Sequence, residues 1–503
     1  MTEALDELRT RLQEVSDLSS AAALLSWDQM TYMPPGGAEA RGRQIAMLEK
    51  LAHARRTDPR MGELFGKLAN VPEDSREQAL VRVARRKYDL ARRVPSSFVS
   101  ESSEHAAASY VAWTKARPEN DFATMRPFLE RTVELSQRYA DFFPGYEHPA
   151  DPHMDASDEG MTAARVKELF DSLRGALVPL VAAIGAKPSP DDAFLHRTYP
   201  VPVQLEFGRS IIEALGYDFD RGRQDFTHHP FMTKFAHGDV RITTRAKEND
   251  VGDAFFSTVH EAGHALYEQG IDASLDGTPL GEGVSAGVHE SQSRLWENLV
   301  ARSRPFWSWA YPQLRAAFPE NLKDVDVDAF HRAINRVTPS LIRVDADEVT
   351  YNLHVMVRVD LEMRLLDGRL AVRDLPDAWH AAYQATLGVR APDDRDGVLQ
   401  DVHWYSGLLG GAFQGYTLGN VMGAQFFAAA RRALPDLDER IAHGEFGTLR
   451  GWLTENLYRH GSTHRPLELV ERATGKPLST DDFVGYLRSK FGALYGIDTS
   501  TLR

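Results

Sequence analysis

The chain has 503 residues, of which 43% are hydrophobic, and this is enough to bury a sizeable core. Its formal net charge of −14 argues against a nucleic-acid-binding protein, which normally has a basic face. There is no cysteine, so disulfides and thiolate metal sites are excluded, and any metal must be bound by histidine and carboxylate groups. The start of the chain is acidic, and no apolar run is long enough to span a bilayer, so we expect a cytoplasmic protein without membrane partners.

Apolar residues recur at helical spacing through most of the chain, which predicts a mainly α fold. In chain order, this pattern predicts helices at Glu3–Ser16, Arg76–Arg93, Met125–Phe143, Thr162–Ile184, Asp253–Gln269, Ser285–Ser303, Val349–Leu366, Leu418–Ala433 and Phe446–Tyr458. One segment, Gly238–Thr244, alternates β-branched and polar residues and predicts a strand of a small sheet. No linker is long or polar enough to separate domains, so we expect a single helical domain over residues 1–503.

A metal-binding motif of the form H-E-x-x-H lies at His260–His264, inside one of the predicted helices. Residues four apart lie one turn apart on the same face of a helix, so both imidazoles can reach one tetrahedral cation. Glu261 projects beside that cation and can take a proton from a bound water. The helical context favours a metal site over two core histidines that stand four apart by chance.

A third ligand is expected on the helix that follows the loop after His264. Ser285 is a suitable N-cap for that helix, and 25 residues lie between His264 and Glu290. The alternative is that Glu290 only pairs with Arg294, one helical turn away. His289 and Glu297 are rival ligands, and spacing alone does not decide among the three.

Several longer motifs resemble those of the carboxypeptidase Taq family of metallocarboxypeptidases, and together they cover nearly the whole chain. The matching segments, in chain order, are Leu25–Gly36 (LSWDQMTYMPPG), Asp239–Thr243 (D-x-R-x-T), His260–Gly270 (HEAGHALYEQG), His289–Gln292 (H-E-S-Q), Ile342–His354 (IRVDADEVTYNLH) and Gly397–Trp404 (G-x-x-Q-D-x-H-W). The family has an aromatic-proline segment before its Y-T-L-G-N run. In this chain the loop before Tyr416 is Gly-Gly-Ala-Phe-Gln-Gly instead.

The resemblance implies a large, almost all-helical body with a deep active-site groove, a metal at the floor of that groove, and a homodimer. Together with the predicted strand, we expect a mainly α fold with a small β-sheet near the metal site. It implies release of single residues from peptide C-termini with broad side-chain preference. It also implies that His260, His264 and Glu290 bind the metal and that Glu261 is the general base. Zinc is the expected metal, with cobalt as a possible substitute.

Hydrolysis of a peptide also requires donors for the oxyanion of the tetrahedral intermediate. The resemblance makes His403 and Tyr416 the candidates for this role. His403 can equally be a core histidine of a helix-like segment, and Tyr405 is a rival of Tyr416.

An exopeptidase must also bind the terminal carboxylate of its substrate, and the planar guanidinium of arginine suits this task. Arg343 and Arg241 are the candidates. Each has a structural alternative, an internal ion-pair network for Arg343 and a solvent-facing position on the predicted strand for Arg241. Three acidic residues are candidate acceptors for the ligand imidazoles: Asp347, Glu348 and Asp401.

Two other functions remain open from the sequence. The same metal core could serve a dipeptidyl carboxypeptidase or an endo-acting oligopeptidase, which the products of a defined peptide would distinguish. The chain could also be a helical binding protein with a structural metal or none. Structural zinc sites fill all four positions with protein ligands, whereas three ligands and a free glutamate suit an open catalytic site.

Overall fold

The computed structural model describes residues 2–502. Helices account for 68% of the residues, and the strands form one small sheet. This confirms the predicted fold class. The chain forms two compact units, each built from three chain segments. The first unit contains the described residues up to Arg92, Asp191–Ile334 and Phe426–Pro477; the second contains Arg93–Pro190, Asn335–Gln425 and the described residues from Leu478 onward. The single domain over residues 1–503 stays a prediction.

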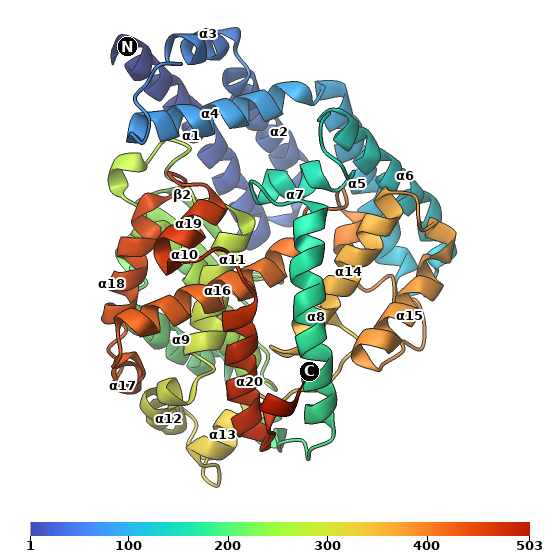
Figure 1. The fold of residues 1–503 in the computed structure, drawn as a ribbon, viewed down its shortest axis with the longest axis vertical. Coiled ribbons are helices and arrows are strands. Elements are labelled where there is room, and N and C mark those ends of the chain that lie inside the picture. Colours follow the sequence, from blue (N-terminus) through green and yellow to red (C-terminus); the bar gives the residue numbers. More distant parts are fainter. Residues whose placement is uncertain (1, 503) are drawn as a thin grey trace. The chain divides into compact units, whose positions relative to one another are not determined.

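The first unit combines the sheet with most of the helices (Figure 1). Its helices are α1 (Thr2–Thr31), α2 (Ala38–Arg56), α3 (Pro59–Lys67), α4 (Arg76–Arg93, whose last residue lies in the second unit), α9 (Val201–Leu215), α10 (Val251–Gly270), α11 (Ala286–Arg294), α12 (Arg304–Ala317), α13 (Val327–Ile334), α17 (Leu437–Ala442), α18 (Gly447–Asn456) and α19 (Pro466–Thr474). A π-helical turn, η5 (Leu295–Val300), continues α11. Helices α1 and α2 pack side by side as a hairpin.

The sheet has three strands, β1 (Gln224–Phe226), β2 (Met232–Ala236) and β3 (Asp239–Thr244), in the order β1-β3-β2. The central strand β3 runs parallel to β1 and antiparallel to β2, and Ile242 stands opposite both Gln224 and Met232. Val240 and Ile242 are completely buried. The sheet packs against α10. The strand predicted at Gly238–Thr244 is therefore confirmed as β3, next to the helix that contains the H-E-x-x-H motif.

Capping residues fix the two helices that contain the metal-binding motifs. The Asp250 side chain accepts hydrogen bonds from the first backbone amides of α10, and the Ser285 side chain accepts one from Val288 N at the start of α11. Phe255, Val259 and other apolar residues bury the inner face of α10. Helices α10 and α11 then pack directly against each other.

The second unit contains helices and loops, and none of the three strands lies in it. Its helices are α5 (Ser96–Ala116), α6 (Phe122–Asp141), α7 (Asp151–Ser157), α8 (Ala163–Gly185), α14 (Thr350–Leu366), α15 (Leu375–Leu387), the first part of α16 (Phe413–Ala433) and α20 (Asp481–Tyr495). Helices α8 and α14 pack on each other. Nearly all of α14 is buried, including polar side chains, and this helix leads to the second group of candidate residues.

Most predicted helices occur with bounds shifted by a few residues, and the helix at Arg76–Arg93 occurs as predicted. The prediction of one helix over Ser285–Ser303 needs a correction, because the α-helix ends at Arg294 and a π-helical turn follows. Helices such as α2 and α5 were not predicted, because only Ala52 of α2 and few residues of α5 are buried, and neither has a clear apolar stripe.

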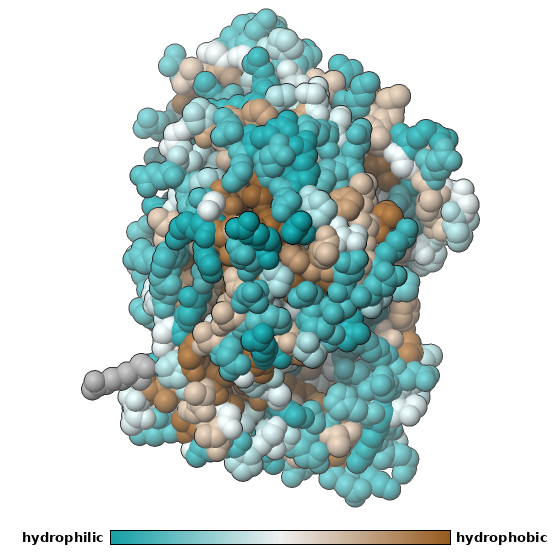
Figure 2. Space-filling view, turned by 90° about the vertical axis from the view of Figure 1, so that its right-hand side faces the viewer, coloured by the Kyte–Doolittle hydropathy of each residue, from teal (hydrophilic) through white to brown (hydrophobic). Residues whose placement is uncertain are grey.

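The face in Figure 2 is mostly hydrophilic, with apolar patches between hydrophilic residues. Within residues 2–502, no helix has both the length and the apolar content that crossing a membrane requires.

Candidate active site

Helix α10 presents the two histidines of the H-E-x-x-H motif on one face, and their rings lie with centroids 5.0 Å apart. Gly263, between them in sequence, lies where α11 crosses. A Cβ at this position would be 2.7 Å from the backbone oxygen of Gln292 and 2.7 Å from the Cα of Ser293. The motif therefore needs glycine here, because only a residue without a side chain lets α11 approach closely enough to bring Glu290 to the histidines.

Three donor atoms converge between α10 and α11. Glu290 Oε2 lies 3.6 Å from His260 Nε2 and 3.3 Å from His264 Nε2, and ligand atoms of all three residues lie within 4.8 Å of one another. Donors at 2.0–2.1 Å from a tetrahedral cation stand about 3.4 Å apart, so these spacings fit such an ion. Two imidazole nitrogens and one carboxylate oxygen are also a donor set that zinc accepts.

The outer ring nitrogens of the two histidines contact different partners. His260 Nδ1 lies 2.9 Å from Glu297 Oε2, and His264 Nδ1 lies 2.6 Å from His289 Nδ1. The two rival ligands, His289 and Glu297, thus stand behind the histidines rather than among the three converging atoms. A partner in this position orients a ligand imidazole and raises its basicity.

One arginine pairs with both acidic side chains that face the histidines. Arg294 donates to Glu290 Oε1 at 2.7 Å and to Glu297 Oε2 at 3.2 Å. Burial alone would raise the pKa values of both carboxyls, but Arg294 and the neighbouring histidines outweigh it. The pKa of Glu297 falls to about 2, and that of Glu290 falls well below its ordinary value. Both residues are therefore ionised and can accept hydrogen bonds or bind a cation.

Glu261 is different, since burial raises its pKa to about 7. Its side chain is 7% exposed, and its carboxylate has no hydrogen-bond or ion-pair partner among residues 2–502. Burial also lowers the pKa of His264 to about 4, which keeps this imidazole neutral. A bound dication would lower the pKa of Glu261 again, because it favours the carboxylate form. An unpartnered carboxylate beside the three donors can accept a proton.

Arg241 lies on β3 in the same unit, and its guanidinium is already paired. It donates from Nε and from a terminal nitrogen to both oxygens of Asp239, each at 2.8 Å. The guanidinium also lies over the rings of Trp27 and Phe235, 4.4 and 5.0 Å from their centroids. Arg241 is thus largely enclosed rather than solvent-facing.

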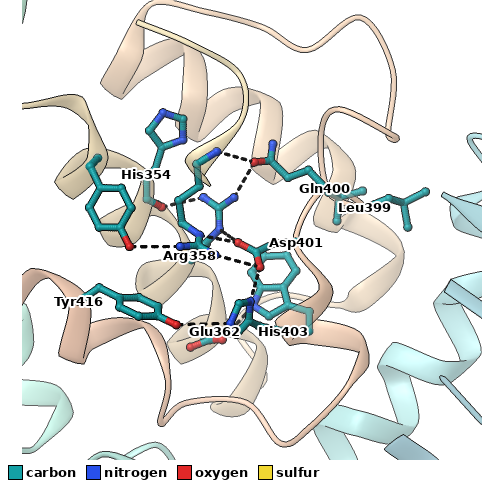
Figure 3. Close-up of polar contacts among 12 residues, drawn as sticks. His354, Arg358, Glu362, Leu399, Gln400, Asp401, His403 and Tyr416 are labelled. Atoms are coloured by element: carbon teal, nitrogen blue, oxygen red, sulfur yellow. Dashed lines mark hydrogen bonds and ion pairs between the residues drawn. The ribbon is translucent and has the colours of Figure 1, made fainter. Parts of the chain in front are cut away.

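The other candidate residues belong to the second unit, where they form a cluster around Asp401 (Figure 3). Arg343 Nε donates to Asp401 Oδ2 at 2.6 Å and Arg358 Nε donates to the same oxygen at 2.9 Å. Gln400 Oε1 accepts from a terminal nitrogen of Arg358 at 2.8 Å. Arg358 is fully buried and Arg343 is 5% exposed. The hydrogen bond with His403 and the two cations hold the pKa of Asp401 far below its ordinary value against the effect of burial.

His403 lies at the edge of this cluster, in the short 3₁₀ helix η8 (Val402–Tyr405). Its Nδ1 lies 2.5 Å from Asp401 Oδ1, and its Nε2 lies 3.4 Å from the hydroxyl of Tyr416. An ionised carboxylate only accepts hydrogen bonds, so Nδ1 carries a proton and Nε2 is directed to Tyr416. The rival Tyr405 is 1% exposed and donates to the backbone oxygen of Val398.

The three acids considered as acceptors for the ligand imidazoles have other partners. Asp401 accepts from His403 and the two arginines, Asp347 caps the start of α14, and Glu348 pairs with Lys490 at 2.6 Å. The acceptor for His260 is Glu297, which the sequence suggested only as a rival ligand.

A family model described as carboxypeptidase Taq (M32) metallopeptidase matches residues 7–491. The chain belongs to this family. It is therefore a metallocarboxypeptidase, as the sequence motifs predicted.

Curated members of the M32 family are similar over almost their whole length. The thermostable carboxypeptidase 1 of Thermus thermophilus is 44% identical over 498 residues, with 96% of this chain and 97% of the relative covered. Carboxypeptidase 1 of Bacillus subtilis is 38% identical over 489 residues, with the same coverage.

The fold is also that of solved M32 structures. The crystal structure of the M32 carboxypeptidase from Deinococcus radiodurans matches with a TM-score of 0.96 at 54% identity and covers 98% of this chain and 100% of the other. The structure of a carboxypeptidase from Pyrococcus furiosus matches with a TM-score of 0.94 at 33% identity, over 98% and 99% of the two chains.

Proposed function

We propose that this metallocarboxypeptidase uses zinc to release single residues from peptide C-termini with broad side-chain preference, and that cobalt can replace the zinc. The observation that carries the proposal is the convergence of His260, His264 and Glu290 at 3.3 and 3.6 Å, the spacing of donors around one tetrahedral cation. The fourth position remains for water or substrate, as in catalytic rather than structural zinc sites.

Glu261 is the general base of the proposed reaction. A cation at the three ligands supplies a Lewis acid for the substrate carbonyl and a lowered pKa for water. The Glu261 carboxylate takes the proton of the attacking water and transfers it to the leaving amine. Its lack of another partner supports this role, because a base that is already hydrogen-bonded would have to break that bond first.

The remaining candidates act on the substrate in this proposal. His403 and Tyr416 stabilise the oxyanion. Because Asp401 holds the Nδ1–H of His403, the Nε2 of this ring donates to the oxyanion only in the doubly protonated form, in which both ring nitrogens are donors. Arg343 or Arg241 binds the terminal carboxylate. One carboxylate, Asp401, pairs with two arginines, Arg343 and Arg358, so this cluster has a surplus of positive charge. Arg241, by contrast, is balanced by its own carboxylate, Asp239. This difference favours Arg343.

The products of one defined peptide test the proposed specificity. A peptide of ten residues with differing C-terminal side chains is incubated with the zinc-loaded protein, and mass spectra are recorded over time. Loss of single residues in sequence from the C-terminus is the expected result. Dipeptide release or internal cleavage would refute the proposal and would indicate a dipeptidyl carboxypeptidase or an oligopeptidase with the same metal core.

We also propose that the protein acts as a cytoplasmic homodimer on peptide substrates. The complete absence of cysteine supports a location where disulfides are not needed for stability. Light scattering during size exclusion tests the assembly, with twice the chain mass of 56.3 kDa as the expected result.

A further inference from the structure

The Nδ1 atoms of the two α10 histidines, His260 and His264, contact chemically different groups. His260 Nδ1 faces a carboxylate, which can only accept a hydrogen bond when ionised. His264 Nδ1 faces the Nδ1 of another imidazole, His289, at 2.6 Å. At this contact one nitrogen must donate and the other must accept, so the direction of the hydrogen bond depends on what lies beyond His289.

Beyond His289 lies a buried carboxylate that sets this direction. His289 Nε2 lies 2.9 Å from Glu268 Oε1, which also accepts from the backbone amide of Gly283 at 2.9 Å. Lys234 on β2 donates to Glu268 Oε2 at 3.0 Å. Both oxygens of Glu268 thus accept from N–H donors, and the charge of Lys234 favours the ionised form of this carboxyl. Glu268 is thus an acceptor only, and the proton between it and His289 is on His289 Nε2.

The remaining proton positions follow from this one for a His289 with a single ring proton. With that proton on Nε2, the ring has a lone pair on Nδ1, so His289 Nδ1 accepts. The donor at the 2.6 Å contact is then His264 Nδ1–H. His264 is left with a lone pair on Nε2, the nitrogen that lies 3.3 Å from Glu290 Oε2 and faces the metal position.

We propose that His289, held by Glu268, is a positioning residue that fixes the proton of His264 on Nδ1 and leaves Nε2 available to bind the metal. The inference rests on the proposed metal ligands and extends them to the residues behind one of them. His289 does not serve as a ligand itself, because its Nδ1 and Nε2 are both occupied by hydrogen bonds.

The local packing supports a specific place for the His289 ring. A Cβ at Gly283 would lie 2.6 Å from His289 Cδ2 and 3.2 Å from Glu268 Oε1, so the chain passes directly over this contact. The ring of Tyr267 packs against His289 with centroids 5.4 Å apart. The imidazole is therefore packed closely between Gly283 and the ring of Tyr267.

The proton positions are tested directly on the zinc-loaded wild-type protein. Long-range proton–nitrogen correlation spectra of protein labelled with ¹⁵N-histidine distinguish a protonated ring nitrogen from one with a lone pair, and a spectrum of His289→Gln assigns the His289 signals. We expect the proton of His289 on Nε2. A proton on Nδ1, or on both nitrogens, would overturn the inference.

Metal affinity tests the consequence with matched variants. His289→Phe keeps a flat ring but cannot accept from His264, and we expect the zinc dissociation constant to rise about 10- to 100-fold in competition with a chelator. His289→Gln can accept with its oxygen and donate with its nitrogen, so it should recover most of the affinity. His443→Phe, on an exposed histidine of the same unit, is the control and should bind zinc as the wild type does.

The outcomes separate the inference from the function on which it rests. Wild-type zinc affinity in His289→Phe would overturn the inference. Equal losses of zinc affinity in the Phe and Gln variants would also overturn it, provided that both variants unfold at the same urea concentration as the wild type. If His289→Phe does not fold, the wild-type spectra and the Gln variant still decide. A wild-type protein that binds no zinc would instead refute the proposed metal site.

Discussion

Replacement of Gly263 by alanine tests whether the close approach of α10 and α11 builds the metal site. The added methyl group would lie 2.7 Å from Gln292 O and 2.7 Å from Ser293 Cα, whereas ordinary contact begins at about 3.4 Å. Both neighbours are backbone atoms, so α11 must retreat by about 0.7 Å, and such overpacking costs about 1–3 kcal/mol of unfolding free energy. Metal–ligand distances are held to about 0.2 Å, so Glu290 would leave its position and zinc affinity should fall roughly tenfold or more.

The assay pairs urea unfolding with zinc titration against a competing chelator. Gly451→Ala in α18 is the control, because a Cβ there meets nothing within 4 Å. We expect this control to gain roughly 0.5–1 kcal/mol of stability from the helix propensity of alanine and to bind zinc normally. Wild-type stability and wild-type zinc affinity in Gly263→Ala would show that the close approach of α10 and α11 does not build the metal site.

Three further changes have expected outcomes. Asp401→Asn leaves two buried arginines without their shared carboxylate and should cost about 3–5 kcal/mol in urea unfolding, whereas Asp438→Asn, in an exposed ion pair, should cost less than about 1 kcal/mol; equal costs would contradict the assignment. Burial raises the pKa of Glu362 from an ordinary 4.5 to about 8. Between pH 4.5 and 8 the folded protein therefore holds a proton on Glu362 that the unfolded chain releases, and the free energy of unfolding falls as the pH rises through this window. From pH 6 to 8 the wild type should lose about 2–3 kcal/mol that Glu362→Gln does not lose, and parallel pH curves would contradict this. Excess chelator should abolish hydrolysis, and added zinc or cobalt should restore it; full activity after verified metal removal would contradict a metal-dependent reaction.

The sequence predicted the parts of the fold whose signal is local. The H-E-x-x-H helix, the Ser285 cap and the strand at Gly238–Thr244 depend on residue periodicity and on side chains within a few positions. The π-helical turn after Arg294 was not predictable, because nothing in the apolar pattern of 285–303 distinguishes it from a regular helix. The short strands β1 and β2 have too few residues to show a period and depend on their pairing with β3.

The roles of the carboxylates near the metal position depend on distances between helices, which spacing along the chain does not give. Glu290 and Glu297 are seven residues apart, so both face α10, and only the structure shows which one lies at Nε2 and which at Nδ1 of the histidines. Glu268 was also not predicted, because its partner His289 comes from a different helix. The pairing of Arg241 with Asp239, two residues away on one strand, is the local case that an alternation pattern does indicate, since both side chains lie on the same face.

The most direct test of the account is a single measurement on Glu261→Gln, in which bound zinc and peptide hydrolysis are determined on the same sample. The amide keeps the size of the side chain but cannot take a proton, and none of the three converging ligands is changed. We expect one zinc per chain, as in the wild type, with hydrolysis reduced by at least about 10²-fold. Wild-type hydrolysis by this variant would contradict the role of Glu261 as general base, and loss of the zinc would contradict the assignment of the ligands.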